Sequence, residues 1–154
     1  MSDSDSMQRW HLRMREKPVL RIVAKRFIPF VLLFALYVQF HGDYGPGGGF
    51  QAGVIFAAGL ILYAMIFGRE ALEKVAPPRA VEIAAALGVL LYTGVGVATM
   101  LGGGNFLAYG ALDSHDPMHG QHLGILLVEA GVGITVAAVM TAVYFCYAGR
   151  GAGE

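Results

Sequence analysis

The chain has few charged residues and a single cysteine. Of its 154 residues only 14% are Asp, Glu, Lys or Arg, whereas 56% are hydrophobic. This composition excludes an ordinary soluble domain and indicates an integral membrane protein. The lone Cys146 excludes an internal disulfide, which argues against disulfide-carrier chemistry. Residues 1–18 are polar and lack the apolar core of a cleavable signal, so we expect a cytoplasmic N-terminal tail there.

Motifs of several catalytic and binding classes are missing as well. The glycines at 47–49 lack the GxxxxGK[ST] pattern of a phosphate loop, and no Ser–His–Asp or Cys–His arrangement suggests a nucleophile. The basic residues near the N-terminus predict membrane orientation rather than nucleic-acid binding. We therefore expect a protein that is not an enzyme, holds no cofactor and no metal ion, and binds no nucleic acid.

Four apolar stretches predict an all-α membrane protein with four transmembrane helices. The expected spans are about residues 19–40, 49–68, 80–101 and 122–148, and residues 149–154 form a short C-terminal tail. Each stretch approaches the ~20 residues that a helix needs to cross the hydrocarbon core. The first span reaches this length only if basic side chains near its start extend to the headgroups.

The basic residues alternate between the segments that connect these stretches. Four Lys or Arg precede the first span and three lie in its first turns, three more lie between the second and third spans, and one follows the fourth. The other two connections contain none. Because cytoplasmic loops are enriched in Lys and Arg, this alternation predicts that both termini are cytoplasmic.

The segment from His41 to Phe67 combines a glycine turn with an apolar helix. Pro46 and the glycines at 47–49 exclude an ordinary helix before Phe50. Gly49, Gly53 and Ala57 then follow at intervals of four. This spacing places them on one helix face, which predicts close approach of another helix. We also expect close packing at Gly88, Gly94 and Gly96 of the third span.

Glu129 is the one acidic residue expected deep inside a span. A carboxylate at such a depth is costly and usually faces a protein interior or an aqueous path. Two interpretations remain open: a site that handles protons or cations, and a hydrogen-bonded carboxyl group that joins helices. Thr135 is a possible oxygen ligand. Asp43 and His41 could line an outer ion entrance, although an Asp beside glycines is more typical of a turn.

Three histidines cluster in the connection between the third and fourth spans. His115, His119 and His122 accompany Asp113 and Asp116 in this connection. Asp116 followed by Pro117 is typical of a helix N-cap and first helical position, which would leave His115 outside the helix. A solvated loop is therefore favoured, and the alternatives are a metal site and a pH-sensitive loop.

The stretch FHGDYGPGGGFQAGVIFAAGLILY resembles the signature of the B subunit of multisubunit Na⁺/H⁺ antiporters of the Mrp, Mnh or Sha type. The matching positions are Pro46, Gly47, Gly48, Gly49, Phe50 and Gly53. The fourth span is similar to the family's acidic-x-Gly-Val stretch, with Glu129 at the acidic position and Gly131 after it. The order His41-Gly42 departs from the family's usual Gly-His pair. The resemblance covers about residues 19–148.

The resemblance implies a multi-pass subunit of a large assembly in a prokaryotic plasma membrane. Its partners would include subunits similar to those of the proton-pumping NADH dehydrogenase, besides membrane lipids. The assembly would exchange cytoplasmic Na⁺ for external H⁺, and this chain would contribute helix packing and part of an ion path. Two alternatives remain: a membrane anchor of a related redox complex such as a membrane-bound hydrogenase, and a purely structural subunit.

Overall fold

A computed structural model describes residues 18–42, 47–113 and 115–150 of the chain. Within these ranges the structure is helical: α2 spans Pro18–His41, α3 Gly49–Phe67, α4 Arg69–Val75, α5 Pro78–Leu101 and α6 Pro117–Arg150. A short 3-10 helix, η1, covers Tyr109–Ala111 between α5 and α6. The predicted all-α fold is confirmed for the described residues.

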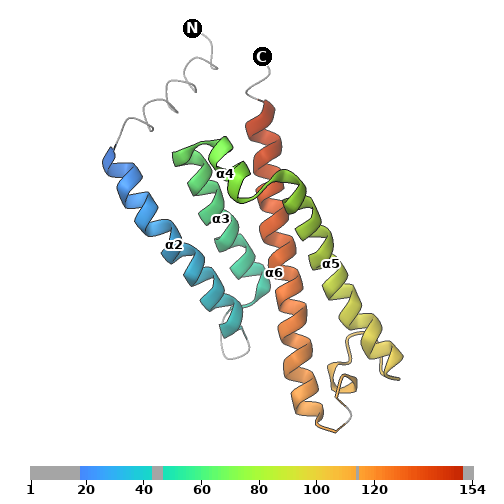
Figure 1. Cartoon of the computed structure of the whole chain (residues 1–154). Helices are drawn as coiled ribbons and strands as arrows, with labels where there is room; N and C mark the ends of the chain where they lie inside the picture. The colour runs from blue at the N-terminus through green and yellow to red at the C-terminus, as the bar shows by residue number, and fades with distance from the viewer. Residues whose placement is uncertain (1–17, 43–46, 114, 151–154) are drawn as a thin grey trace.

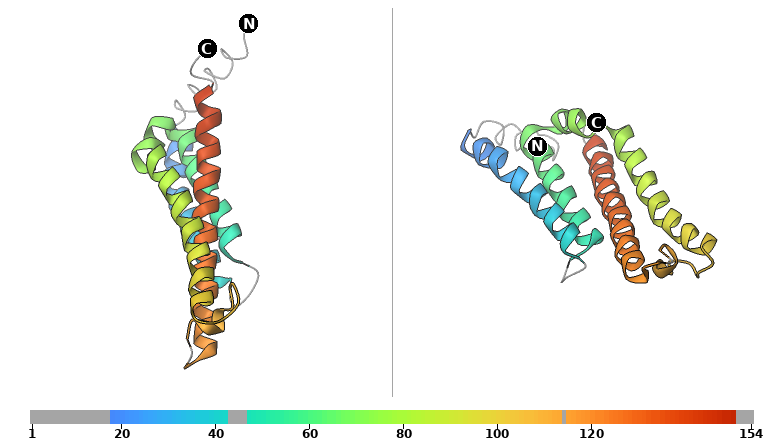
Figure 2. Two further views of the ribbon diagram at one scale, coloured as in Figure 1. Left: turned by 90° about the vertical axis from the view of Figure 1, so that its right-hand side faces the viewer. Right: turned by 60° about the horizontal axis from the view of Figure 1, so that its bottom comes forward.

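The four long helices lie side by side in the order α2, α3, α6 and α5; α3 and α6 are parallel to each other, and α2 and α5 run in the opposite direction (Figure 1). Figure 2 shows them as a single open layer rather than a closed bundle. The packing therefore runs from α2 to α3, from α3 to α6 and from α6 to α5. The start of α2, the end of α6 and all of α4 lie at one end of the layer, whereas the α2–α3 turn lies toward the opposite end.

Three of the helices are long and apolar enough to cross a membrane: Gly49–Phe67, Pro78–Leu101 and Pro117–Gly149. The α2 helix has sufficient length, with 24 residues. Its first turns carry Arg21, Lys25 and Arg26, and its last turn carries Gln39 and His41, which lower its mean hydropathy. The length and composition of the helices support three membrane spans. The expected fourth span, at α2, therefore stays a prediction.

Small residues bring α6 close to both of its neighbours. Gly49, Gly53 and Ala57 of α3 are buried, as the four-residue spacing predicts. A Cβ atom placed at Gly53 would lie 2.7 Å from the main-chain oxygen of Gly133 in α6. On the other side of α6, a Cβ at Gly88 of α5 would lie 2.7 Å from the main-chain oxygen of Gly131. Helix α6 is thus packed closely on both sides, against α3 and against α5.

The expectation for the third span was partly wrong. Gly88 and Gly96 are buried, but Gly94 is exposed and a Cβ there would meet no atom within 4 Å. Gly94 lies on the face of α5 that points away from α6. Small residues on a single helix can therefore lie on different faces, and their number alone does not identify the ones that pack against another helix.

The helices extend to different levels at the end of the layer that carries the α2–α3 turn. Helix α3 has 19 residues and α6 has 34, which correspond to about 28 and 51 Å at 1.5 Å per residue. Helices α5 and α6 accordingly extend beyond the α2–α3 turn (Figure 1). Their connection folds back on them: the ring of Phe106 packs on Gly96, and Tyr109 packs on Gly124. The Leu107 N–H donates to the Thr99 hydroxyl at 3.0 Å.

Candidate functional site

The carboxylate of Glu129 lies against the glycine turn between α2 and α3. A Cβ atom placed at Gly42 would be 2.5 Å from Oε2 and 2.9 Å from Oε1 of Glu129. A Cβ at Gly48 would be 3.1 Å from Oε1. These two glycines flank the turn, since Gly42 follows α2 and Gly48 precedes α3. The turn and the carboxylate therefore share one small space that side chains at 42 and 48 would fill.

The backbone of the turn explains why its residues are glycines. Gly48 has a φ of 117°, a conformation that residues with a Cβ rarely adopt. Its N–H donates to the Val38 carbonyl of α2 at 3.3 Å, and its carbonyl accepts from Ala52 N at 3.0 Å. Gly48 thus ends the turn and begins α3. A Cβ at Gly49 would run into the main-chain oxygen of Glu129, so α3 starts in direct contact with the α6 backbone.

The position of Glu129 suits a negative charge. The first N–H groups of a helix carry a partial positive charge, and Glu129 lies beside the first residues of α3. The Glu129 side chain is partly buried and lies beside the α2–α3 turn. Glu129 is twelve residues, about 18 Å, from the start of α6 at Pro117.

The structure does not bring together all the residues that the sequence suggested for an ion path. His41 is the last residue of α2, and its ring stacks on Tyr37 with centroids 5.1 Å apart. Thr135 lies on the α5 side of α6: its hydroxyl donates to the Gly131 carbonyl at 2.8 Å and packs on Gly88. Glu129, by contrast, faces the glycine turn. Asp43 and Pro46 lie outside the described residues.

The other residues of the motif have distinct environments. A Cβ at Gly47 would lie 2.9 Å from the Val38 carbonyl oxygen, so this glycine permits the turn to close on α2. Gly131 is buried against Gly88 and Tyr92 of α5. The Phe50 side chain is 65% exposed. The motif therefore combines a packed backbone with one exposed aromatic ring.

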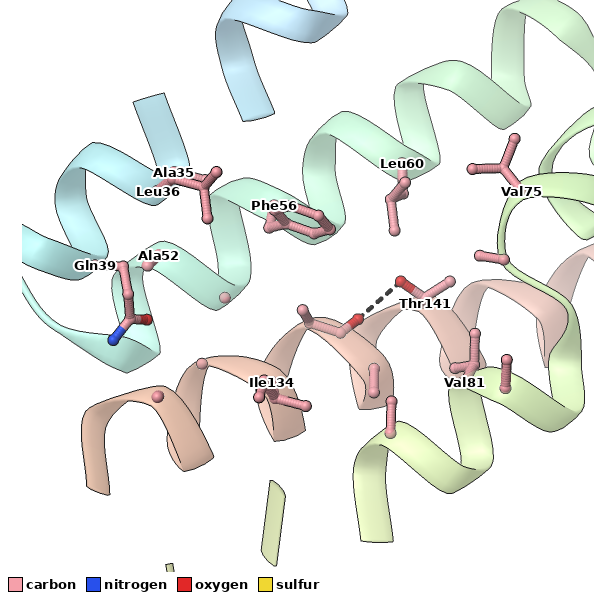
Figure 3. Close-up of a pocket in the computed structure, with 18 residues that line it drawn as sticks. Ala35, Leu36, Gln39, Ala52, Phe56, Leu60, Val75, Val81, Ile134 and Thr141 are labelled. Carbon is pink, nitrogen blue, oxygen red and sulfur yellow. Dashed lines mark hydrogen bonds between the residues drawn. The ribbon is translucent and has the colours of Figure 1, made fainter. Parts of the chain in front are cut away.

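An apolar cavity of about 520 Å³ runs along α6 between the α2–α3 pair and the α4–α5 side (Figure 3). Most of its lining is alanine and glycine, and Phe56 and Leu60 of α3 are among the few large side chains. Gln39 of α2 and Thr141 of α6 are its polar residues. The Thr141 hydroxyl donates to the Ala137 carbonyl at 2.7 Å. The Gln39 Nε2 atom is buried and has no hydrogen-bond partner within the described part of the chain.

Gln39 was missed by the reasoning from sequence. Its Oε1 atom lies against Gly133 of α6, at 2.5 Å from a Cβ placed there. The available signal was an amide in the apolar run of the first helix, where a polar side chain is expected to face other helices. Gln39 thus links α2 to α6, although these helices have few other contacts.

The histidine-rich connection is a hydrogen-bonded loop. The Asp113 carboxylate accepts from the N–H groups of His115 and Asp116 at 3.0 and 3.2 Å, and its Oδ2 lies 3.1 Å from His119 Nδ1. The N–H of Asp116, the His119 ring and the N–H of His115 lower the pKa of Asp113. Within residues 18–42, 47–113 and 115–150, no group of three His, Cys, Asp or Glu side chains could hold a metal ion.

The predicted start of the last helix is confirmed in its capping residue. The Asp116 carboxylate accepts from the N–H groups of Met118 and His119 at 3.0 and 3.3 Å, and Pro117 is the first residue of α6. The helix therefore begins at Pro117 rather than at His122, and His115 lies outside it. The expected loop was too long because apolar periodicity is weak over residues 117–121.

The end of the layer opposite the α2–α3 turn is basic, and Arg69 connects two of its helices. Its Nε atom donates to Glu73 Oε1 at 2.6 Å, and its guanidinium lies 5.7 Å from the centre of the Phe145 ring. Arg21 of α2 lies in the same way over Phe67 at 5.5 Å. These contacts fix α4 on α6 and α2 on α3 at the end that carries the Lys and Arg residues.

Comparison with known proteins identifies the family. Residues 19–142 match the model of a domain related to the MnhB subunit of Na⁺/H⁺ antiporters. A protein named "Putative antiporter subunit mnhB2" from Staphylococcus aureus strain Newman is 34% identical over 134 residues, which cover 85% of this chain and 94% of that protein. Its namesake from Staphylococcus haemolyticus is 31% identical over 133 residues, with 80% and 93% covered. The chain therefore belongs to the family of the MnhB subunit of Na⁺/H⁺ antiporters.

Proposed function

We propose that the chain is a subunit of a multisubunit antiporter that exchanges cytoplasmic Na⁺ for external H⁺. Membership of the MnhB family supports this role, as does a layer of apolar helices that suits a multi-pass membrane protein. A plasma membrane fits the bacterial relatives. Its partners would be the other antiporter subunits, including ones similar to subunits of the proton-pumping NADH dehydrogenase.

We infer that the basic end of the layer faces the cytoplasm. Arg21, Arg69 and Lys74 lie at the end where α2 starts and α6 finishes, and Lys and Arg are enriched on the cytoplasmic side. The α2–α3 turn and Glu129 then lie toward the outer side. Reporter fusions within residues 69–75 and 102–113 should accordingly report opposite sides of the membrane.

The position of Glu129 is the observation that supports a role in transport. Its carboxylate lies at the turn, where α2 ends, α3 begins and α6 continues past both, rather than in the middle of a helix interface. A carboxylate at the outer edge of the shorter helices can exchange a proton or attract a cation from the outer side. The site therefore supports Glu129 as part of the outer ion path.

Replacement of Glu129 tests this role. Glu129→Gln is nearly isosteric and should leave the complex assembled, while exchange of Na⁺ for H⁺ in membrane vesicles falls sharply or changes its pH optimum. Glu129→Asp should keep part of the activity because it retains the carboxylate. A purely structural role predicts the opposite: Gln would be almost neutral, and Glu129→Leu would lower complex abundance and activity together.

The cavity along α6 supports the second part of the proposed role, helix packing with other subunits. Its alanine and glycine lining differs from the face of α2, where Phe27, Phe30 and Phe34 are exposed as expected for side chains that meet lipid. Small side chains let helix backbones approach closely. A helix of another subunit could also give the buried Gln39 amide an acceptor, which a lipid chain cannot do. No observation on the described residues favours a redox complex over the antiporter.

A further inference from the structure

We propose that Gly42 is a positioning residue for the carboxylate of Glu129. The three atoms nearest to a Cβ placed at Gly42 are Oε2, Oε1 and Cδ of Glu129, at 2.5, 2.9 and 3.0 Å. The atoms nearest to the space that a side chain at position 42 would need thus all belong to this carboxyl group. The absence of a side chain at Gly42 sets where the carboxylate can stand.

Conformation does not explain a glycine at position 42. Positive φ values among the described glycines occur only at Gly48, Gly68 and Gly103. The φ of Gly42 therefore lies outside the left-handed region that favours glycine. Helix interior propensity does not explain it either, because Gly42 follows the last residue of α2. Space for the Glu129 side chain remains as the physical reason.

The neighbouring glycines act differently, which makes Gly42 separable from them. A Cβ at Gly49 would meet the main-chain oxygen of Glu129, and a Cβ at Gly47 would meet the Val38 carbonyl oxygen. Those clashes involve backbone and do not depend on the side chain at position 129. At Gly42 the clash involves the far end of a flexible side chain, which can move away. Gly42→Ala should therefore displace the carboxylate while leaving the helices in place.

A direct contact between Gly42 and the Glu129 carboxylate predicts a specific compensation between positions 42 and 129. Aspartate is one methylene shorter than glutamate, so its carboxylate withdraws by about 1.5 Å from the turn. In the Glu129→Asp background, the methyl group of an alanine at position 42 fits into the space that the longer glutamate side chain fills in the wild type. The Gly42→Ala substitution should be harmful with Glu129 and much less harmful with Asp at that position, and such non-additivity is the mark of a direct contact.

The test is a double-mutant cycle of Gly42→Ala and Glu129→Asp in the assembled complex, with two readouts. One readout is the temperature at which the complex is lost from native gels, and the other is the pH profile of Na⁺/H⁺ exchange in vesicles. We expect Gly42→Ala to lower exchange severalfold and to move the pH profile when Glu129 is present, and we expect the same substitution to change exchange much less in the Glu129→Asp background. Gly94→Ala is the matched control, since a Cβ there meets no atom within 4 Å.

The two proposals fail in different ways, because the transport readout rests on the proposed ion-path role whereas the thermal readout does not. If Glu129→Gln leaves transport unchanged but the thermal cycle is non-additive, Gly42 still positions the carboxylate and the ion path is wrong. If the thermal effects of the two substitutions simply add, the positioning role is overturned, whatever Glu129 does. A Gly42→Ala complex that behaves like the Gly94→Ala complex would overturn it as well.

Discussion

The chain has two runs of three glycines, and the structure uses them for different physical reasons. Residues 47–49 precede α3, and residues 102–104 follow α5. In the first run Gly49 has the α6 backbone directly against it, and Gly48 has the Glu129 carboxylate. In the second run Gly103 has a φ of 83° and no atom within 4 Å of a Cβ placed on it.

The two runs show two different reasons for a glycine: lack of space for a side chain, and a backbone conformation that other residues disfavour. Gly103 ends α5 because its backbone is left-handed, and its N–H donates to the Met100 carbonyl at 3.1 Å. Gly49 has no unusual φ but stands where two helices touch. Gly49 of the first run is thus needed for close packing and Gly103 of the second for its backbone conformation, although Gly48 of the first run also has a positive φ. Substitutions can distinguish these roles, because a clash and an unfavourable φ respond to different side chains.

Gly49→Ala should have the largest effect. Its Cβ would run into the main-chain oxygen of Glu129 and lie 3.0 Å from Gly133 N, so α3 and α6 must separate. Overpacking of this kind typically costs about 1–3 kcal/mol or more, and here no flexible side chain can relieve it. We expect a clear loss of assembled complex on native gels. A complex of normal yield and activity would mean that α3 and α6 are not in contact through this glycine.

Gly103→Ala should have an intermediate effect of about 1 kcal/mol, because an L-residue is disfavoured in the left-handed region. Gly103→Asn should cost less, since Asn tolerates this conformation better than Ala does. The measurement is the temperature at which each complex is lost on heating. Equal losses for Ala and Asn would contradict a conformational role and indicate a contact that the open space around Gly103 does not suggest.

Sequence reasoning was successful for the helices and for the packed face of α3, because both depend on local patterns. Apolar length defines the helices, and the spacing of Gly49 and Gly53 defines the face. It also selected Glu129, since a lone acidic residue in an apolar run is conspicuous. It could not predict that Glu129 meets Gly42 rather than Thr135, because that choice depends on the rotation and depth of α6 relative to the α2–α3 turn. The sequence pattern of one helix does not encode either quantity.

The exposure of Gly94 illustrates the same limit. Gly88, Gly94 and Gly96 are equally small, and the interval between Gly88 and Gly96 is about two helical turns. Gly94 lies about 160° from Gly96 around the helix axis at 100° per residue, so it cannot share their face. A stricter use of helical periodicity would have separated Gly94 from the packed pair, whereas the partner of Gly96, the Phe106 ring of the following loop, required the tertiary structure.

The smallest effect is expected at the second turn, where Asp113 organises the loop before α6. Hydrogen bonds from the N–H groups of Asp116 and His115 and from His119 favour the ionised carboxylate, so the pKa of Asp113 is lower in the folded loop than in an unfolded chain. A carboxylate with a lowered pKa stabilises the fold above its unfolded pKa of about 4, and this contribution is lost as the pH falls through the lowered folded value. Asp113→Ala should therefore weaken hydrogen-exchange protection of the His115 and Asp116 amides at neutral pH.

The same variant should differ less and less from the wild type as the pH is lowered below about 4, because the wild-type carboxyl group then becomes protonated too. Asp113→Asn is the control, since its amide oxygen can still accept from the two N–H groups while the charge is removed. The first turn should not respond, because its glycines contact α2 and α6 rather than Asp113. An equal loss of protection in α3 would show that the two turns are coupled, and a protection difference that persists at low pH would remove the Asp113 charge from the explanation.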